Sequence, residues 1–285
     1  MTMKARPRRS ALYMPASNAR AIEKARGLGC DVVILDLEDA VAPDAKAAAR
    51  EQALAAVTEG GFGRRELVVR VNALDSPWGR DDLAALAGAA VDAVLVPKID
   101  DAATIAEIRD LLHGTVSIWA MIETPRALLR LQAIAAAPGL GALVLGTNDI
   151  IKETGMRPGA DRLPMTGFLA DSVVAARAYG LAVLDGVYNA IEDADGLARE
   201  CAQGVSFGFD GKTLIHPNQI ASCNAAFSPD ADEIAAARQI VAAFESPAAA
   251  GKGAIRLEGR MVERLHLDQA RRTLAIADLL DGNAP

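Results

Sequence analysis

The stretch DVVILDLED, residues 31–39, decides the fold. Residues 32–35 form an unbroken run of branched apolar side chains, and three acids follow within the next four positions. A strand with one face in water alternates apolar and polar residues, whereas a strand of a parallel sheet that is covered on both faces is apolar throughout. The run therefore predicts a buried parallel strand that carries carboxylates at its C-terminal end.

Seven further runs of this kind predict seven more strands. Together the predicted strands cover 10–14 (SALYM), 31–37 (DVVILDL), 66–72 (ELVVRVN), 92–98 (DAVLVPK), 117–123 (SIWAMIE), 142–149 (ALVLGTND), 181–187 (LAVLDGV) and 204–210 (GVSFGFD). Alanine-rich segments with helical spacing alternate with them, at 17–29, 43–58, 79–90, 101–113, 125–137, 167–179, 192–203 and 217–226. Eight successive strand–helix units predict an α/β protein with a closed (β/α)8 TIM barrel rather than an open sheet.

Two more helical segments follow the eighth unit, at 230–245 and 261–280, with a loop rich in Ala, Gly and Ser between them. We therefore expect two domains, a barrel over residues 1–228 and a C-terminal helical extension over 229–285. The extension could cap the barrel or pack on a neighbouring subunit.

The composition limits the classes of function. A net charge of −7 gives no basic surface for nucleic acid, and no apolar run is long enough to span a bilayer. The basic N-terminus, MTMKARPRRS, is not followed by the apolar segment of a signal peptide, and three scattered cysteines do not form a disulfide framework. We expect a soluble cytoplasmic protein with small-molecule substrates.

Polar residues stand at the C-terminal ends of the predicted strands, where barrels of this class carry their sites. They are Asp36, Glu38, Asp39, Arg70, Asn72, Lys98, Glu123, Asn148, Asp149, Asp185, Asp210 and Lys212. Burying such groups is costly unless they are paired or bind a metal. We therefore expect the active site among them.

Glu123 and Asp149 end adjacent predicted strands, so their carboxylates should converge and repel each other. A hard cation such as Mg²⁺, which prefers oxygen ligands, would relieve that repulsion. The alternative is that each acid caps a helix or joins a surface ion pair. The pair predicts a magnesium site as the leading hypothesis.

Arg70 lies inside a buried run, VVRVN, where a guanidinium needs a carboxylate partner. It could clamp a substrate carboxylate through two hydrogen bonds, or pair with Glu38 or Asp39, and both interpretations can hold. Lys98 could form a Schiff base, as in a covalent aldolase, or pair with a strand-end acid.

Tyr13, Arg20 and Lys24 lie near or after the first predicted strand. Arg20 and Lys24 are four residues apart and share a helix face, where they could bind phosphates or simply be solvated.

Eight motifs occur in one order: RSALYMPASNARAIEKA, VVILDLEDAVAPDAKAAAR, VVRVNALDSPWG, VLVPKI, AMIETPRALL, LGTND, LDGVY and GFDGKTLIHPNQI. In this order they resemble the citrate lyase β-subunit and malyl-CoA/citramalyl-CoA lyase family, the acyl-CoA ester lyases of the HpcH/HpaI aldolase superfamily. The resemblance runs from about residue 8 to the C-terminal helix.

The resemblance implies a Mg²⁺-dependent barrel in a homo-oligomer, a trimer or hexamer. Under it, Glu123 and Asp149 are the metal ligands, Arg70 binds the carboxylate of the keto-acid fragment, and Glu38 and Asp39 are acids behind the metal. Tyr13, Arg20 and Lys24 match positions that contact the CoA substrate.

The chain departs from the resembled pattern in two places. Where relatives often carry an Asp in a motif similar to GKMVD, thought to act as acid/base across a subunit interface, this chain has Glu263 in GRMVERLHLDQA. Where some relatives have GAED, this chain has GTND, which retains Asp149 but changes its neighbours.

The resulting prediction is a carbon–carbon lyase, of the oxo-acid-lyase type. It would cleave a malyl-CoA, citramalyl-CoA or citryl-CoA type ester into a keto acid and an acyl-CoA. Mg²⁺ would polarise the acid end, Arg70 would hold its carboxylate, and Glu263 would move a proton. Two alternatives stay open: a malyl-CoA thioesterase using the same site, or a citrate lyase β-subunit that is active only in a multi-subunit complex.

Overall fold

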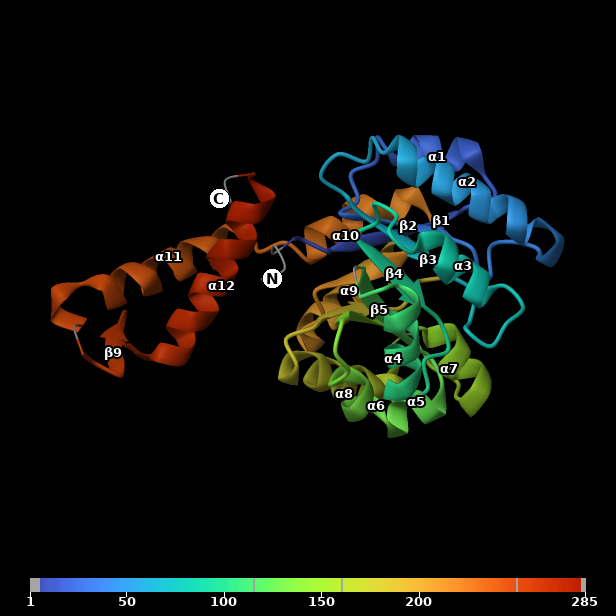
Figure 1. The fold of residues 1–285 in the computed structure, drawn as a ribbon. Helices are drawn as coiled ribbons and strands as arrows, with labels where there is room; N and C mark the ends of the chain where they lie inside the picture. The colour runs from blue at the N-terminus through green and yellow to red at the C-terminus, as the bar shows by residue number, and fades with distance from the viewer. Residues whose placement is uncertain (1–5, 115, 160, 250, 283–285) are drawn as a thin grey trace. The chain divides into compact units, whose positions relative to one another are not determined.

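Eight parallel strands close into a barrel in the computed structural model, which describes residues 6–114, 116–159, 161–249 and 251–282 (Figure 1). The strands are β1 (Ser10–Pro15), β2 (Val32–Asp36), β3 (Glu66–Arg70), β4 (Ala93–Val96), β5 (Ser117–Ile122), β6 (Leu140–Leu145), β7 (Ala182–Asp185) and β8 (Gly211–Leu214). Each pairs with its neighbours in sequence, and β8 pairs with β1 to close the ring, with Ser10 opposite Lys212. The predicted TIM barrel is therefore confirmed.

Helices follow the strands and surround the barrel (Figure 1). They are α1 (Ala19–Ala25), α2 (Lys46–Glu59), α3 (Gly79–Leu86), α4 (Ala102–Leu111), α5 (Pro125–Leu129), α6 (Leu131–Ala135), α7 (Thr147–Thr154), α8 (Thr166–Ala178), α9 (Ala194–Phe207) and α10 (Ile220–Ala226). Short 3-10 helices, η1 (Pro43–Ala45), η2 (Leu163–Met165) and η3 (Pro217–Gln219), precede α2, α8 and α10.

The apolar strands divide their side chains between two cores. On β2, Val32 and Ile34 belong to the cluster inside the barrel, whereas Val33 and Leu35 belong to the larger cluster that also contains helix residues. Successive side chains of a strand point to opposite faces, so the inward series on β2 continues to Asp36. This alternation aims polar side chains at the carboxyl ends of the strands into the mouth of the barrel.

The eighth strand was predicted in the wrong place. Residues 204–207 form the last turn of α9, which ends at Gly208 in a left-handed conformation, and β8 comes after it. The segment looked like a strand because of its Val and Phe residues, but Leu197, Cys201 and Gly204 are buried at helical spacing. The apolar pattern does not predict the true strand, GKTL, because this strand carries a charged residue, Lys212.

Lys212 is fully buried, and an ion-pair cluster satisfies it. Its Nζ lies 3.1 Å from Asp185 Oδ2 and 2.5 Å from Glu200 Oε1, and it also donates to the carbonyl oxygen of Gly186. Arg162 adds a second cation 2.9 Å from Asp185 Oδ1. Two cations therefore face two carboxylates, and the cluster ties the start of the loop after β7 to β8.

Two other boundaries differ from the predictions. The predicted strand 142–149 ends at Leu145, and the residues from Thr147 onward form α7, so Asp149 stands in a first helical turn rather than on a strand. The predicted helix 125–137 is divided into α5 and α6 at Arg130, which has non-helical backbone angles.

The described residues form two compact units: Arg8–Phe227, which is the barrel, and a second unit that comprises residues 6–7 and the chain from Ser228 onward. The second unit contains α11 (Ala231–Glu245), η4 (Pro247–Ala249), an antiparallel hairpin of β9 (Ala254–Leu257) and β10 (Arg260–Glu263), and α12 (Arg264–Leu280). Helices α11 and α12 pack against each other (Figure 1). The predicted helix over 261–280 is thus wrong at its start, where the chain forms β10. Residues 1–5 and 283–285 of the predicted domains lie outside the described residues.

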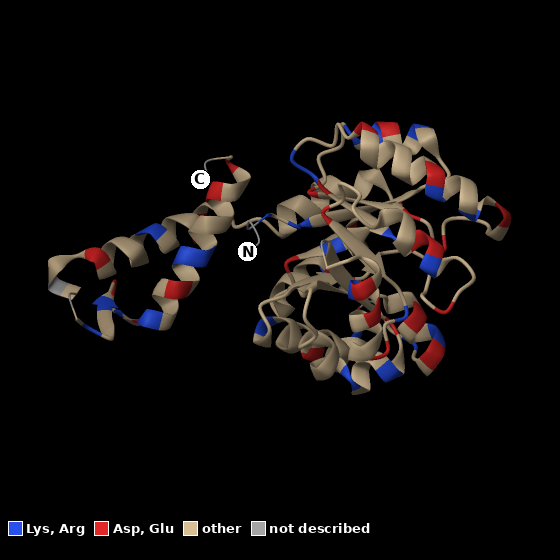
Figure 2. Ribbon diagram, in the orientation of Figure 1, with Lys and Arg blue, Asp and Glu red and all other residues tan. Residues whose placement is uncertain are grey.

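Acidic and basic residues are interspersed along the outer helices of the barrel in the view of Figure 2. None of the helices in the described ranges combines the length and apolarity needed to cross a membrane.

Candidate active site

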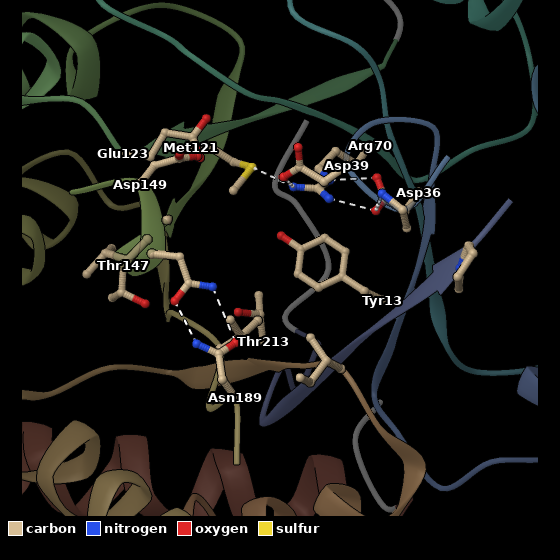
Figure 3. A pocket seen from close by; sticks show the side chains of 17 residues that line it. Tyr13, Asp36, Asp39, Arg70, Met121, Glu123, Thr147, Asp149, Asn189 and Thr213 are labelled. Atoms are coloured by element: carbon tan, nitrogen blue, oxygen red, sulfur yellow. Dashed lines mark hydrogen bonds and ion pairs between the residues drawn. The ribbon is translucent and has the colours of Figure 1, made fainter. Parts of the chain in front are cut away.

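A cavity of about 340 Å³ lies at the carboxyl ends of the barrel strands, with lining residues at or after the ends of seven of the eight strands (Figure 3). Its charged lining residues are Asp36, Asp39, Arg70, Glu123 and Asp149, and its neutral hydrogen-bonding residues are Tyr13, Thr147, Asn148, Asn189 and Thr213. Predicted site residues from four different strand ends therefore meet at one mouth, as the barrel fold requires.

Arg70 is held by carboxylates on one side of this cavity. Its Nε and Nη2 donate to the two oxygens of Asp36, at 2.7 and 2.6 Å, and its Nη1 lies 2.8 Å from Glu38 and 3.5 Å from Asp39. The guanidinium also stacks on the Tyr13 ring, 4.7 Å from its centre. Burial opposes the charge of Arg70, but the ion pair with Asp36 outweighs it and raises the pKa further, so the group is a permanent cation.

Glu38 is a partly buried carboxyl group whose pKa lies well above its ordinary value. Burial raises its pKa to about 8, because the nearby Arg70 lowers the pKa by less than desolvation raises it. At neutral pH this group therefore holds a proton in much of the population, unlike an ordinary surface glutamate.

Glu123 follows β5, and it continues the inward series that contains Trp119 and Met121. Its side chain is almost fully buried, and desolvation raises its pKa to about 7, while the charge of Lys98 works in the opposite direction. A side chain at position 146 would collide with Glu123, so only Gly146 allows β6 to end this close to the carboxylate.

Lys98 contacts both predicted metal ligands. Its backbone N–H donates to Glu123 Oε1 at 2.8 Å, and its Nζ lies 2.5 Å from Asp149 Oδ2 and 3.5 Å from Glu123 Oε1. The residue adopts φ +54°, a left-handed conformation that is uncommon outside glycine. The backbone at the end of β4 is thus shaped so that one residue serves both carboxylates.

The same contacts bear on the Schiff-base hypothesis for Lys98. Burial lowers the pKa of Lys98, but the hydrogen bond to Asp149 and the charges of Glu123 and Asp149 together outweigh this, and the pKa lies above its ordinary value. Because a Schiff base forms from the neutral amine, an ammonium held by a carboxylate is poorly suited to that role.

The donor set suits a magnesium ion with two protein ligands. Glu123 and Asp149 approach one ammonium group, so their carboxylates face a common point. In the part of the chain that the structure describes, no group of three or more His, Cys, Asp or Glu side chains could hold a metal. Mg²⁺ commonly takes one or two carboxylates and completes its shell with water and substrate oxygens, whereas a structural zinc site needs four protein ligands.

Some predicted site residues lie elsewhere. Arg20 and Lys24 are exposed on α1 and are not among the described residues that line this cavity. Glu263 lies in the C-terminal unit, at the junction of β10 and α12, where its backbone N–H donates to His266 Nδ1 at 2.9 Å.

The structure gives partners for Arg70 and Asn148 that the sequence does not predict. Asp36 was noted at a strand end, but its place as the main partner of Arg70 was missed, although the period-two series from Val32 could have indicated it. Asn148 and Asn189, which follow the adjacent strands β6 and β7, form hydrogen bonds to each other through their side-chain amides. Asn189 follows β7 in a loop with no periodic signal, so nothing local indicated this pair.

The chain is similar in sequence and in structure to known proteins. A family model described as HpcH/HpaI aldolase/citrate lyase matches residues 9–217. A (3S)-malyl-CoA thioesterase of Cereibacter sphaeroides is 47% identical over 280 residues, covering 98% of each chain. An L-malyl-CoA/β-methylmalyl-CoA lyase of the same species is 33% identical, covering 97% of this chain and 96% of the relative. The structure of CitE from Mycobacterium tuberculosis in complex with magnesium, acetoacetate and coenzyme A is similar with a TM-score of 0.79 at 32% identity, covering 96% of this chain and 98% of that one.

Proposed function

The chain belongs to the HpcH/HpaI aldolase/citrate lyase family, and from this premise we propose that it hydrolyses a CoA thioester of the (3S)-malyl-CoA type. The products would be free CoA and the free hydroxy acid. The observation that carries the proposal is the 47% identity, over nearly the whole of both chains, to a (3S)-malyl-CoA thioesterase.

The sequence-based prediction of a carbon–carbon lyase is corrected here. The lyase relative is only 33% identical, whereas the thioesterase relatives are 47–48% identical, and each covers nearly the whole chain. The lyase prediction relied on motifs that are common to the family, and such motifs do not distinguish cleavage of a C–C bond from hydrolysis of a thioester. The thioesterase alternative is therefore the better supported one.

The volume and the charged residues of the cavity suit a small acidic substrate. Its volume of about 340 Å³ suits a four-carbon acyl group, so the much larger CoA moiety would extend beyond it. The pair with Asp36 uses two of the five N–H groups of Arg70, and Nη1 faces Glu38 at 2.8 Å, so a substrate carboxylate would accept from the second N–H of Nη2 or displace Glu38 from Nη1. Since Asp36 holds the guanidinium rigidly, Arg70 would bind that carboxylate in one orientation.

Magnesium is part of the proposal. Glu123 and Asp149 would hold the ion, which would supply positive charge at the oxygens of the acid end of the substrate. Tyr13 stacks on Arg70 and excludes water from one face of its guanidinium, while the largely protonated Glu38 limits the negative charge around it. Glu38 would thus act behind the site through Arg70, whereas Asp39, 3.5 Å from Arg70, lines the cavity itself.

Three residues have roles that come from the resemblance alone, and these roles stay in the proposal. Arg20 and Lys24, exposed on α1, would contact the CoA moiety. Glu263 would serve as an acid/base group offered between subunits of a homo-oligomer.

The proposal is tested by identifying the products formed from (3S)-malyl-CoA and Mg²⁺ with the purified chain. We expect one free thiol, detected with a disulfide reagent, and one malate per substrate consumed. Formation of acetyl-CoA and glyoxylate without free CoA would contradict hydrolysis. Turnover by the single purified chain would also contradict the alternative of a subunit that works only in a complex.

Lys98 yields a prediction about metal affinity. Its ammonium neutralises part of the charge of Glu123 and Asp149 and repels a second cation, so Lys98→Met should bind Mg²⁺ about tenfold more tightly. Calorimetric titration of metal-stripped protein with MgCl2 measures this, with Lys152→Met on the exposed side of α7 as the control. Unchanged or weaker binding in Lys98→Met would show that the lysine does not compete with the metal.

A further inference from the structure

Two asparagine side chains form a reciprocal amide pair at the mouth of the barrel. Asn189 Nδ2 donates to Asn148 Oδ1 at 2.8 Å, and Asn148 Nδ2 donates to Asn189 Oδ1 at 3.3 Å. Asn148 lies in the first turn of α7 and Asn189 in the loop after β7, and both line the cavity. The pair therefore joins two segments of the mouth directly beside Asp149.

The pair belongs to a neutral wall that lies across the cavity from Arg70 and its acid partners Asp36 and Asp39. In Figure 3, Thr147, Asn189 and Thr213 lie on the side away from Arg70, Asp36 and Asp39. The guanidinium of Arg70 suits the acid end of a substrate, whereas amides and hydroxyls suit an uncharged group. The cavity thus has two ends of different chemistry, as a molecule with a carboxylate at one end and a thioester at the other would need.

The amide pair has hydrogen-bonding capacity left over. A carboxamide carries two N–H groups, and the pair uses one from each side chain. Both side chains are exposed, and no other hydrogen bond of these two amides is found among the described residues. An N–H donor therefore remains on each amide for a ligand in the cavity.

The donors sit on a rigid support. Gln219 Nε2 donates to the carbonyl oxygen of Tyr188 at 2.9 Å, and the buried Lys212 donates to that of Gly186, so the segment directly before Asn189 is held at two points. Donors held in place before the reaction stabilise a developing charge most effectively, because they need not reorganise.

We infer that the Asn148–Asn189 pair is the site that receives the thioester carbonyl and stabilises the oxyanion formed during hydrolysis. This inference rests on the proposed function. The water oxygen forms a bond to the carbonyl carbon while a cavity carboxylate takes the water proton, and the C=O electron pair moves to oxygen. The C=O bond then re-forms, the C–S bond breaks, and the CoA thiolate leaves and takes up a proton. A free amide N–H beside the carbonyl donates to the oxyanion and lowers this barrier.

The experiment separates this role from that of a structural latch between the two segments. Asn189→Asp keeps an oxygen that can accept from Asn148, but it has no N–H to donate. Asn189→Ala removes both functions. If Asn189 is an oxyanion donor, kcat for (3S)-malyl-CoA hydrolysis should fall about 100-fold in both variants, as it does when other oxyanion donors are removed. KM should stay within about threefold, because the acid end of the site is untouched.

Further variants and measurements complete the test. Asn148→Ala should lower kcat similarly, and the double alanine variant should lose less than the product of the two single losses, because the pair acts as a unit. Mg²⁺ affinity and melting temperature should match the wild type in Asn189→Asp. Asn218→Ala, an exposed asparagine outside the cavity lining, serves as the control and should leave kcat unchanged.

The outcomes distinguish this inference from the proposed function. If the wild type hydrolyses the thioester and Asn189→Asp retains its kcat, the pair is a latch and the inference is wrong. If Asn189→Asp loses activity only through KM or through Mg²⁺ affinity, the inference is also wrong. If the wild type releases no CoA at all, the proposed function itself fails and the pair has no thioester to receive.

Discussion

Glu123→Gln and Asp149→Asn are each expected to lower kcat/KM for thioester hydrolysis by about a thousandfold and to remove measurable Mg²⁺ binding. Glu123 and Asp149 are the two carboxylates that we propose as metal ligands among the described residues, so the loss of either charge leaves one charged ligand. Initial rates at several Mg²⁺ concentrations, together with calorimetric titration, measure both effects. Raising the Mg²⁺ concentration should recover little of the lost activity.

The same variants should keep the fold intact, which makes the result interpretable. In Glu123→Gln the side-chain oxygen can still accept the N–H of Lys98, and the change removes a buried charge that desolvation already disfavours. We therefore expect melting temperatures close to that of the wild type. Glu153→Gln, on the exposed part of α7, is the matched control. Full activity in Glu123→Gln or Asp149→Asn would refute the assignment of the metal ligands.

Arg70→Met is expected to lower both stability and activity. Asp36 is only 1% exposed, and without Arg70 its charge is buried unpaired. Breaking a buried pair by removing one partner costs about 3–5 kcal/mol, so the free energy of unfolding of the barrel should fall by that order. Urea denaturation followed by circular dichroism measures the loss, and the hydrolysis assay measures the activity.

A second variant separates the two roles of Arg70. In the double variant Asp36→Asn/Arg70→Met the buried charge is gone, so much of the lost stability should return, whereas activity should not, because no guanidinium remains for the substrate carboxylate. A stability loss below about 1 kcal/mol in Arg70→Met would mean that Asp36 is compensated by another group. Recovery of activity in the double variant would mean that Arg70 has no part in substrate binding.

Local sequence patterns predicted much of the barrel but not all of its boundaries. Seven strands were found because each is a continuous apolar run, and β8 was missed because its buried Lys212 breaks that pattern. The charge of Lys212 is tolerated only because Asp185 and Glu200 reach it from other elements, and such partners are invisible to a window of a few residues. Helix α7 was missed because the predicted strand 142–149 was extended past Leu145 through GTND, which contains the N-cap and the first residues of the helix.

The function could not be read from the same motifs. Glu123, Asp149 and Arg70 belong to motifs that resemble the family as a whole, so they indicated the class of site and not the bond that is broken. The difference between a lyase and a thioesterase depends on what surrounds the reacting carbonyl. In this chain those surroundings include the pair of Asn148 and Asn189, which are 41 residues apart.

The sequence by itself determined the eight-fold alternation of strands and helices and the polar residues at the carboxyl ends of the strands. Both are local properties, since a run of four to seven residues encodes whether a strand is buried and where it ends. Only the tertiary structure decided which of those residues meet: Arg70 with Asp36, Lys98 with both Glu123 and Asp149, and Asn148 with Asn189. These contacts depend on strand register, on closure of the ring from β8 to β1 and on the inward or outward direction of each side chain, which neighbouring residues along the chain do not specify.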